Sequence, residues 1–207
     1  MLLERNIRNI VGIKSMILIN TGNGKGKTTA ALGQALRAVG EGKRVLMIQF
    51  IKGPWKSGED LFISKIKNQK SKLQSKIQND TNNLDTLFGF EIIKTGRGFV
   101  GILGDSLPRE EHEKAAAEAF EAAEKETESG KWDLMILDEI NNALELQLLK
   151  LEDVTDFVER FPKDKHLILT GRDAPPELIA RADIVTEMRE IKHVFNEGAK
   201  AKRGIEY

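Results

Sequence analysis

A glycine-rich stretch near the amino end constrains the fold of this chain more than any other feature. Residues 21–29 read Thr-Gly-Asn-Gly-Lys-Gly-Lys-Thr-Thr, after the apolar run 16–19 and before the alanine-rich, helix-forming run 30–39. A strand, a glycine loop ending in Gly-Lys-Thr and a helix form the layout of a phosphate-binding P-loop. Glycines let backbone N–H groups turn toward one point, where the helix N-terminus adds partial positive charge.

The side chains of this loop predict a site for a nucleoside triphosphate. Lys27 supplies a full positive charge and the Thr28 hydroxyl can ligate magnesium. We expect the contacts to this nucleotide to come from Gly22, Asn23, Gly24, Lys25, Gly26, Lys27, Thr28 and Thr29. The usual loop has four residues between its first glycine and Gly-Lys-Thr, but here only three follow Gly22. A tighter loop argues against ordinary γ-phosphate chemistry. A glycine turn without a ligand is disfavoured, because its two lysines would repel each other.

Composition excludes several classes of function. Lysine plus arginine and aspartate plus glutamate number 32 each, so no overall field favours nucleic acid or an anionic membrane. The absence of cysteine removes disulfides, thiolate metal sites and cysteine nucleophiles. No apolar run of about 18 residues is present, and residues 1–13 mix charges with apolar residues, unlike a signal peptide. We expect a cytoplasmic protein without nucleic-acid or membrane partners.

Short apolar runs alternate with helix-forming stretches along the chain. Consecutive apolar positions are typical of strands buried on both faces of a parallel sheet. The pattern predicts one α/β domain over residues 1–207 with a three-layer, P-loop NTPase-like fold, in which helices cover both faces of a mostly parallel sheet. The expected strands are 16–20, 44–50, 90–94, 134–137, 166–169 and 184–186.

Two helix starts are signalled by prolines. One helix is expected to have Ser106 as N-cap, Pro108 in its first turn and Gly130 as its stop. Another is expected after Asp173, with residues 175–176, both proline, in its first turn.

Residues 58–87 form a lysine-rich insert between two expected strands. Apolar residues recur at helical spacing until the polar break 79–83, which predicts an amphipathic helix followed by a loop. Its lysines form either a solvated face or a basic patch for an acidic partner. No aromatic residues interleave with the lysines, which argues against single-stranded nucleic acid.

A second polar site follows the apolar run 134–137. Asp138 and Glu139 project from the carboxyl end of this expected strand, where P-loop proteins place an acid beside magnesium. Neighbouring residues alternate sides, so one carboxylate is expected to touch the ion directly. An acidic N-cap of the next helix is the alternative. Arg172 follows another apolar run and is a weaker candidate for the triphosphate or a second substrate.

Several segments together resemble a known family. They are 21–31, Gln49-Phe50-Ile51-Lys52-Gly53, Leu137-Asp138-Glu139-Ile140-Asn141, Thr170-Gly171-Arg172 and the tail 185–207. They are similar to the P-loop type of ATP:corrinoid adenosyltransferase, which acts on cob(I)yrinic acid a,c-diamide or cob(I)alamin. The resemblance implies transfer of the 5′-deoxyadenosyl group of ATP to Co(I), with release of triphosphate.

The resemblance also implies roles for individual residues. Lys27, Glu139 and Arg172 are the implied catalytic residues, and Arg172 also belongs to the ATP site. Thr28 and Glu139, with Asp138, are implied to hold Mg²⁺ or Mn²⁺. The family acts as a homodimer, and an electron-donor protein such as a flavodoxin or another reductase is an implied partner.

The family binds ATP reversed relative to other P-loop proteins, which is compatible with the tightened loop. Co(I) carries no proton and attacks the ribose C5′ directly, so the reaction needs no general base. The sequence fits this requirement, since His112, His166 and His193 lie far apart and form no recognisable triad.

One stretch departs from the family. Gly98-Phe99-Val100-Gly101 stands where members often carry Gly-Phe-Thr-Trp. The resemblance implies that Phe99 contacts the corrinoid, while Gly101 replaces the tryptophan. Phe99 as an ordinary core residue is the alternative. A different function is also open: a P-loop ATPase or switch that hydrolyses ATP to ADP and phosphate to drive a partner interaction.

Overall fold

The fold is built on a six-stranded sheet. The structure, a computed structural model, describes residues 15–53, 55–74, 89–98, 100–101, 105–198 and 200–205. All paired strands run parallel, in the order β3-β2-β4-β5-β1-β6. The strands are β1 (Ile17–Thr21), β2 (Val45–Gln49), β3 (Phe90–Lys94), β4 (Leu134–Asp138), β5 (His166–Thr170) and β6 (Ile184–Glu187). The predicted α/β class and all six expected strands are confirmed.

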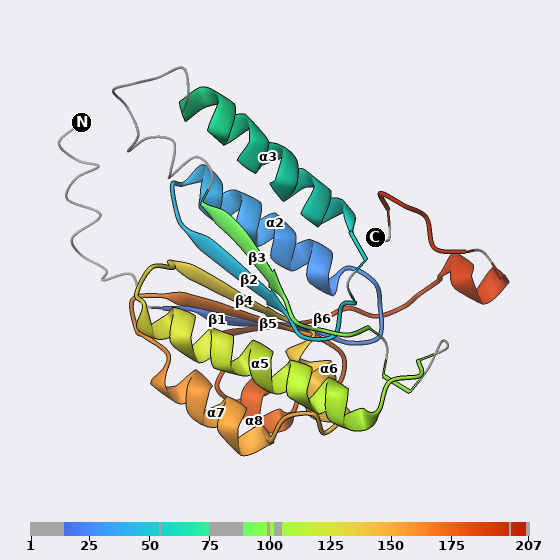
Figure 1. The fold of residues 1–207 in the computed structure, drawn as a ribbon. Coiled ribbons are helices and arrows are strands. Elements are labelled where there is room, and N and C mark those ends of the chain that lie inside the picture. The colour runs from blue at the N-terminus through green and yellow to red at the C-terminus, as the bar shows by residue number, and fades with distance from the viewer. Residues whose placement is uncertain are drawn as a thin grey trace.

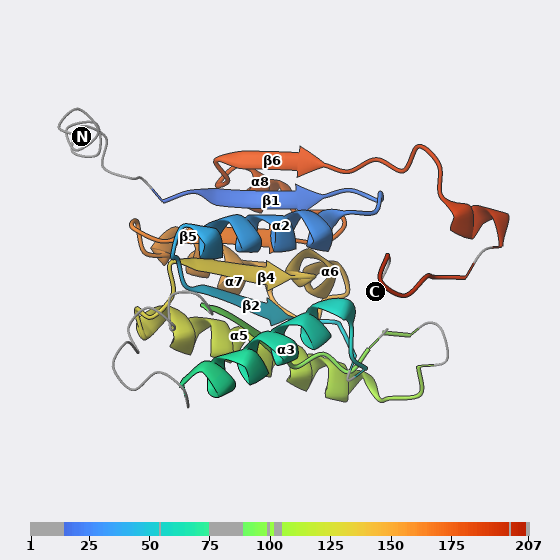
Figure 2. The same ribbon diagram turned by 90° about the horizontal axis from the view of Figure 1, so that it is seen from above.

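Helices cover both faces of the sheet, as predicted (Figures 1 and 2). On one face lie α2 (Lys27–Gly40) and α3 (Gly58–Gln74). On the other lie α5 (Arg109–Glu128), α6 (Ile140–Glu145), α7 (Leu151–Arg160) and α8 (Pro176–Ile179). Beyond β6, the chain carries the short 3₁₀ helix η1 (Val194–Glu197). No helix among the described residues is both long and apolar enough to span a membrane.

Alternating side chains of the central strands fill two cores. Val45 and Met47 of β2 pack in the cluster that contains Ala31 and Ala35 of α2. The intervening residues of β2 join the larger cluster on the opposite face, with aromatic residues of α5 and α7. Successive residues of a strand point to opposite faces, so a continuous apolar run supplies both cores at once. These two cores fix the sheet that carries the site at its carboxyl edge.

The prediction that every strand is buried on both faces is wrong for the two edge strands, β3 and β6. All residues of β2 and β4 are buried, whereas all four residues of β6 are exposed and those of β3 are half-buried. Each of these edge strands has a neighbour on one side only. An apolar strand pattern does not reveal where the strand lies in the sheet.

The helix starts also differ in detail from the prediction. Pro108, and not Ser106, is the N-cap of α5, and no side chain caps this helix. Gly130 follows its C-cap with a φ of 63°, as expected of the stop. The helix after Asp173 is α8, which has only four residues and takes Pro175 as its N-cap. The helix expected within the insert is confirmed over 58–74, and residues 75–87 lie outside the described part.

Candidate functional site

Four strand ends meet at one edge of the sheet. The glycine loop follows β1, and Gln49, Asp138 and Thr170 end β2, β4 and β5. In the strand register Gln49 pairs with Asp138, and Thr170 pairs with Asn20. The carboxyl edge of an open parallel sheet is where α/β proteins bind ligands. The fold therefore brings the glycine loop and the acidic strand end together.

The glycine loop is held by its own lysine. Lys27 Nζ donates hydrogen bonds to the carbonyl oxygens of Gly22 and Gly24, at 2.6 and 2.9 Å. Burial lowers the pKa of Lys27. Gly26 precedes α2 with a φ of 119°, a conformation that favours glycine. The loop thus keeps its curvature around the lysine ammonium at the N-terminus of α2.

The segment after β6 passes directly against the loop. Gly24 N donates to Met188 O at 2.7 Å. A β-carbon at Gly22 would lie 2.5 Å from Met188 O, and one at Gly24 would lie 2.7 Å from the carbonyl carbon of Arg189. These two glycines therefore allow one backbone to approach another. Farther along the tail, Ile205 O accepts a hydrogen bond from Lys25 Nζ at 2.9 Å.

Asp138, at the end of β4, contacts four side chains of the site. Its side chain is fully buried. Oδ1 accepts hydrogen bonds from the hydroxyls of Thr28, at 2.8 Å, and Thr170, at 2.7 Å. Oδ2 accepts one from Gln49 Nε2 at 3.1 Å and lies 3.6 Å from Lys52 Nζ. Thr28 and Asp138, singled out separately in the sequence, are in direct contact.

Glu139 has an unusual backbone and an unusual carboxyl group. It is the N-cap of α6 with a φ of 65°, in the left-handed region that non-glycine residues rarely adopt. Its backbone N–H donates to Thr170 Oγ1 at 2.9 Å. Burial and the nearby Asp138 charge raise the pKa of Glu139 to about 7, against the opposing charges of Lys27 and other cations. This carboxyl group can exchange a proton near neutral pH.

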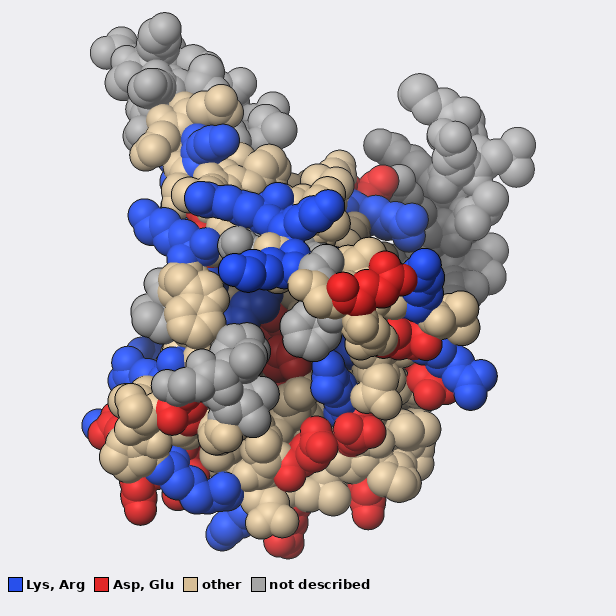
Figure 3. All heavy atoms as spheres, turned by 90° about the vertical axis from the view of Figure 1, so that its right-hand side faces the viewer, with Lys and Arg blue, Asp and Glu red and all other residues tan. Residues whose placement is uncertain are grey.

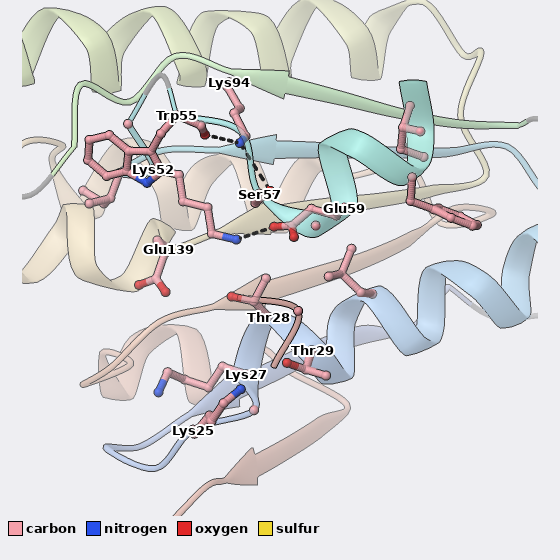
Figure 4. Close-up of a pocket in the computed structure, with 18 of the residues that line it drawn as sticks. Lys25, Lys27, Thr28, Thr29, Lys52, Trp55, Ser57, Glu59, Lys94 and Glu139 are labelled. Atoms are coloured by element: carbon pink, nitrogen blue, oxygen red, sulfur yellow. Dashed lines mark hydrogen bonds and ion pairs between the residues drawn. The ribbon is translucent and has the colours of Figure 1, made fainter. Parts of the chain in front are cut away.

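A cavity of about 970 Å³ opens beside these groups. Figure 3 faces this edge of the molecule, where Lys and Arg side chains surround a recess. Thr28 and Thr29 lie in the cavity between Lys27 on one side and Lys52 with Glu139 on the other (Figure 4). The cavity continues as an apolar trench between α2 and α3, lined by Leu32, Leu36, Val39, Phe62, Ile63 and Ile66.

Most of the site residues expected from the sequence border this space. The main cavity is lined by Lys25, Gly26, Lys27, Thr28, Thr29, Glu139 and Arg172. Asn23 and Gly24 line a smaller hollow of about 220 Å³ on the other side of the loop, which Arg172 also reaches. The exposed Arg172 is anchored through its backbone N–H, which donates to Asn142 Oδ1 at 2.8 Å. Phe99 lies outside the described residues, although its neighbour Gly98 lines the cavity.

Three further residues at the cavity were not identified from the sequence. Lys52 forms an ion pair with Glu59 at 2.7 Å, and both line the cavity with Trp55. Lys52 stands only three residues beyond the end of β2. A lysine so close to a strand end could have been predicted to lie at the carboxyl edge of the sheet. Its contact with Asp138 could not have been predicted, because the sequence does not show that β2 lies next to β4.

The oxygen groups present suit a hard divalent cation. The hydroxyl of Thr28 and the carboxylates of Asp138 and Glu139 are ligands of the kind that magnesium takes. The described residues contain no group of three or more His, Cys, Asp or Glu side chains able to hold an ion. Magnesium is usually bound by one or two carboxylates together with phosphate oxygens and water. The residues fit such an ion when a polyphosphate supplies the remaining ligands.

Comparison with known proteins identifies the family. A family model described as "ATP:corrinoid adenosyltransferase BtuR/CobO/CobP" matches residues 13–207. The chain belongs to this family.

Named relatives of this corrinoid adenosyltransferase family member are similar over nearly its whole length. The corrinoid adenosyltransferase of Escherichia coli K12 is 35% identical over 194 residues, covering 94% of this chain and 86% of the relative. Corrinoid adenosyltransferase CobA of Salmonella typhimurium is 34% identical with the same coverage. The Pseudomonas aeruginosa relative is 32% identical, covering 94% of this chain and 84% of its own.

Proposed function

We propose that this protein transfers the 5′-deoxyadenosyl group of ATP to the Co(I) of a reduced corrinoid and releases triphosphate. One observation carries the proposal beyond family membership: a phosphate-binding loop and an apolar trench share one continuous cavity. The loop suits the polyanionic part of ATP, and the trench offers apolar contacts to a bulky second substrate. Cobalamin, cobinamide and cob(I)yrinic acid a,c-diamide share a corrin macrocycle that could make such contacts, while their polar side groups face solvent.

The proposed reaction requires placement and charge stabilisation. The Co(I) electron pair forms the new bond to C5′, while the bond between C5′ and the α-phosphate oxygen breaks and leaves its electrons on triphosphate. Lys27 and the loop N–H groups face the charge that builds on this leaving group. Arg172 lies at the open side of the same space. Holding C5′ in line with cobalt lowers the activation barrier further, because the reacting atoms are already oriented.

Thr28, Asp138 and Glu139 would hold Mg²⁺ or Mn²⁺ in this proposal. When bound, the ion supplies positive charge to the triphosphate. The Thr28–Asp138 contact supports this assignment, because it places a hydroxyl and a carboxylate next to each other at the N-terminus of α2, where the phosphates would lie. Glu139, which follows Asp138, adds a second carboxylate that lines the cavity.

The wider proposal includes the assembly and the partners. Residues 1–207 would act as one domain, with 58–87 as an insert, because all six described strands belong to one sheet. We propose a cytoplasmic homodimer that receives electrons from a flavodoxin or another reductase. Phe99 would contact the corrinoid beside Gly98, which lines the cavity.

A P-loop ATPase or switch is the second candidate. The observation in its favour is Glu139, whose pKa of about 7 suits a group that accepts a proton from water. Hydrolysis requires such proton transfer, whereas attack by Co(I) does not. This rival predicts ADP and phosphate as products, in amounts independent of corrinoid.

One incubation separates the two functions. The protein is mixed with ATP, Mg²⁺ and chemically reduced cobalamin, and the products are separated by chromatography. Adenosylcobalamin and triphosphate in equal amounts are expected. ADP and phosphate without adenosylated product would support the ATPase, and ATP binding without either set of products would contradict both functions.

A further inference from the structure

Lys52, which lies outside the glycine loop, brings its ammonium group close to the buried carboxylate of Asp138. Its Nζ lies 3.6 Å from Asp138 Oδ2 and 2.7 Å from Glu59 Oε1. Burial alone would lower the pKa of Lys52, but the charge of Asp138 and the hydrogen bond to Glu59 outweigh it, so the pKa is raised. Lys52 therefore stays an ammonium ion between two carboxylates.

The two oxygens of Asp138 have different partners. Oδ1 receives the hydroxyls of Thr28 and Thr170, which are neutral donors. Oδ2 receives the Gln49 amide and faces Lys52. A fully buried carboxylate needs a compensating charge. Among the charged groups in contact with Asp138, Lys52 gives this carboxylate its compensating positive charge.

Lys52 also faces the expected position of the phosphates. It lines the same cavity as Lys27 and Thr28. In Figure 4 it enters from the wall opposite Lys27, with Thr28 and Thr29 between the two lysines. A polyphosphate lying along the loop would have one ammonium group on each side.

Glu59 keeps Lys52 in its present position. This glutamate stands in the first turn of α3 and lines the cavity. Its carboxylate would repel a polyphosphate if Lys52 did not neutralise it. The neighbouring Asp60 forms an ion pair with Lys94 and accepts hydrogen bonds from Ser57, so the first turn of α3 is itself anchored.

We propose that Lys52 is an exchangeable cation. It compensates Asp138 while no metal is bound, and it turns to the polyphosphate when a divalent ion takes its place beside that carboxylate. Lys52 would then bind the triphosphate part of the substrate and of the released product. The inference rests on the phosphate site of the proposed function but does not require adenosyl transfer to a corrinoid.

Two binding measurements test this exchange without any turnover. Mn²⁺ alone is titrated by electron paramagnetic resonance, and inorganic triphosphate with Mg²⁺ is titrated by calorimetry. Lys52→Met is expected to bind Mn²⁺ about tenfold more tightly, because a competing cation is gone, and triphosphate about tenfold more weakly. Glu59→Gln should bind triphosphate several-fold more tightly, because it removes a negative charge that competes for Lys52. Lys56→Met, an exposed lysine outside the cavity lining, should change neither affinity.

The signs of the changes decide the outcome. Parallel losses of Mn²⁺ and triphosphate binding in Lys52→Met would assign Lys52 a merely structural role and overturn the proposal. Unchanged triphosphate affinity in this variant would overturn it as well. If Lys52→Met does not fold, Glu59→Gln decides the question, because weaker triphosphate binding there contradicts the proposal. Failure of the unmodified protein to bind triphosphate would instead remove the phosphate site on which the proposed function depends.

Discussion

The two walls of the main cavity are built in different ways. The glycine-loop wall, residues 22–29, is held by backbone contacts with Met188 and by Lys27, whose ammonium group binds two loop carbonyls. The opposite wall is held by side chains after β2 and in the first turn of α3. Its contacts are the ion pairs of Lys52 with Glu59 and of Lys94 with Asp60.

This difference separates a fixed surface from an adjustable one. Moving the glycine-loop wall requires breaking buried backbone contacts, whereas the opposite wall can exchange ionic partners. The side chain of Lys52 is 29% exposed, and its ammonium group lies 2.7 Å from Glu59 and 3.6 Å from Asp138, so it can change ionic partner without leaving the cavity. The loop is therefore suited to hold phosphates in one place, and the opposite wall is suited to respond to metal and substrate.

The largest expected effect comes from Lys27→Ala, which removes the ammonium group from the fixed wall. ATP and triphosphate affinity should fall about 100-fold or more, because charge-assisted hydrogen bonds to the phosphates are lost. Calorimetric titration measures the loss, with thermal unfolding as a check on the fold. Lys25→Ala is the matched control: Lys25 is exposed and bonds Ile205 O in the tail, so its loss should stay below about tenfold. Equal losses in both variants would contradict the assignment of phosphate binding to the Lys27 ammonium group of the fixed wall.

The second effect concerns Glu139 and pH. Its carboxyl pKa is raised from 4.5 to about 7, so the native state keeps a proton that the unfolded chain releases. The stability that this proton confers is complete below pH 4.5 and is lost as pH rises through 7, by roughly 3 kcal/mol. Glu139→Gln should therefore equal the unmodified protein in stability near pH 4.5 and exceed it at pH 8. Urea unfolding of the ligand-free proteins at both pH values measures the difference, and a constant difference would rule out this titration.

A smaller effect tests the backbone contact behind the loop. A β-carbon at Gly24 would lie 2.8 Å from Met188 O, so Gly24→Ala should lower the free energy of unfolding by about 2 kcal/mol and weaken triphosphate binding. Gly33 of α2 has no atom within 4 Å of such a carbon. Gly33→Ala should therefore raise stability by about 0.5–1 kcal/mol, through helix propensity, without affecting binding. Denaturant unfolding compares the two, and equal effects would exclude the close approach as the reason for Gly24.

Local patterns accounted for most of the fold. The six apolar runs became the six strands. In the central strands β2 and β4, burial on both faces leaves little room for polar residues. The glycine loop was found because its glycines, its lysine and the start of α2 are consecutive in the chain. Asp138 was found for the same reason, since it directly follows an apolar strand.

Features that depend on spatial neighbours were missed. The ion pair of Lys52 with Asp138 exists because β2 lies beside β4 in the sheet. The facing ends of these strands, Gln49 and Asp138, are 89 residues apart in the chain. The exposed position of β6 follows from its place at the edge of the sheet. Ser106 has a plausible cap sequence, but the structure starts α5 after Pro108.

The sequence by itself determined an α/β chain with a P-loop and an acid at a strand end, because those signals lie within a few consecutive residues. Only the tertiary structure decided which side chains face that loop: Asp138 against Thr28, Lys52 against Asp138, and Met188 against Gly24. The physical reason is the order of strands in the sheet. That order arises from the packing of two cores, and it brings together residues whose separation in the chain carries no local signal.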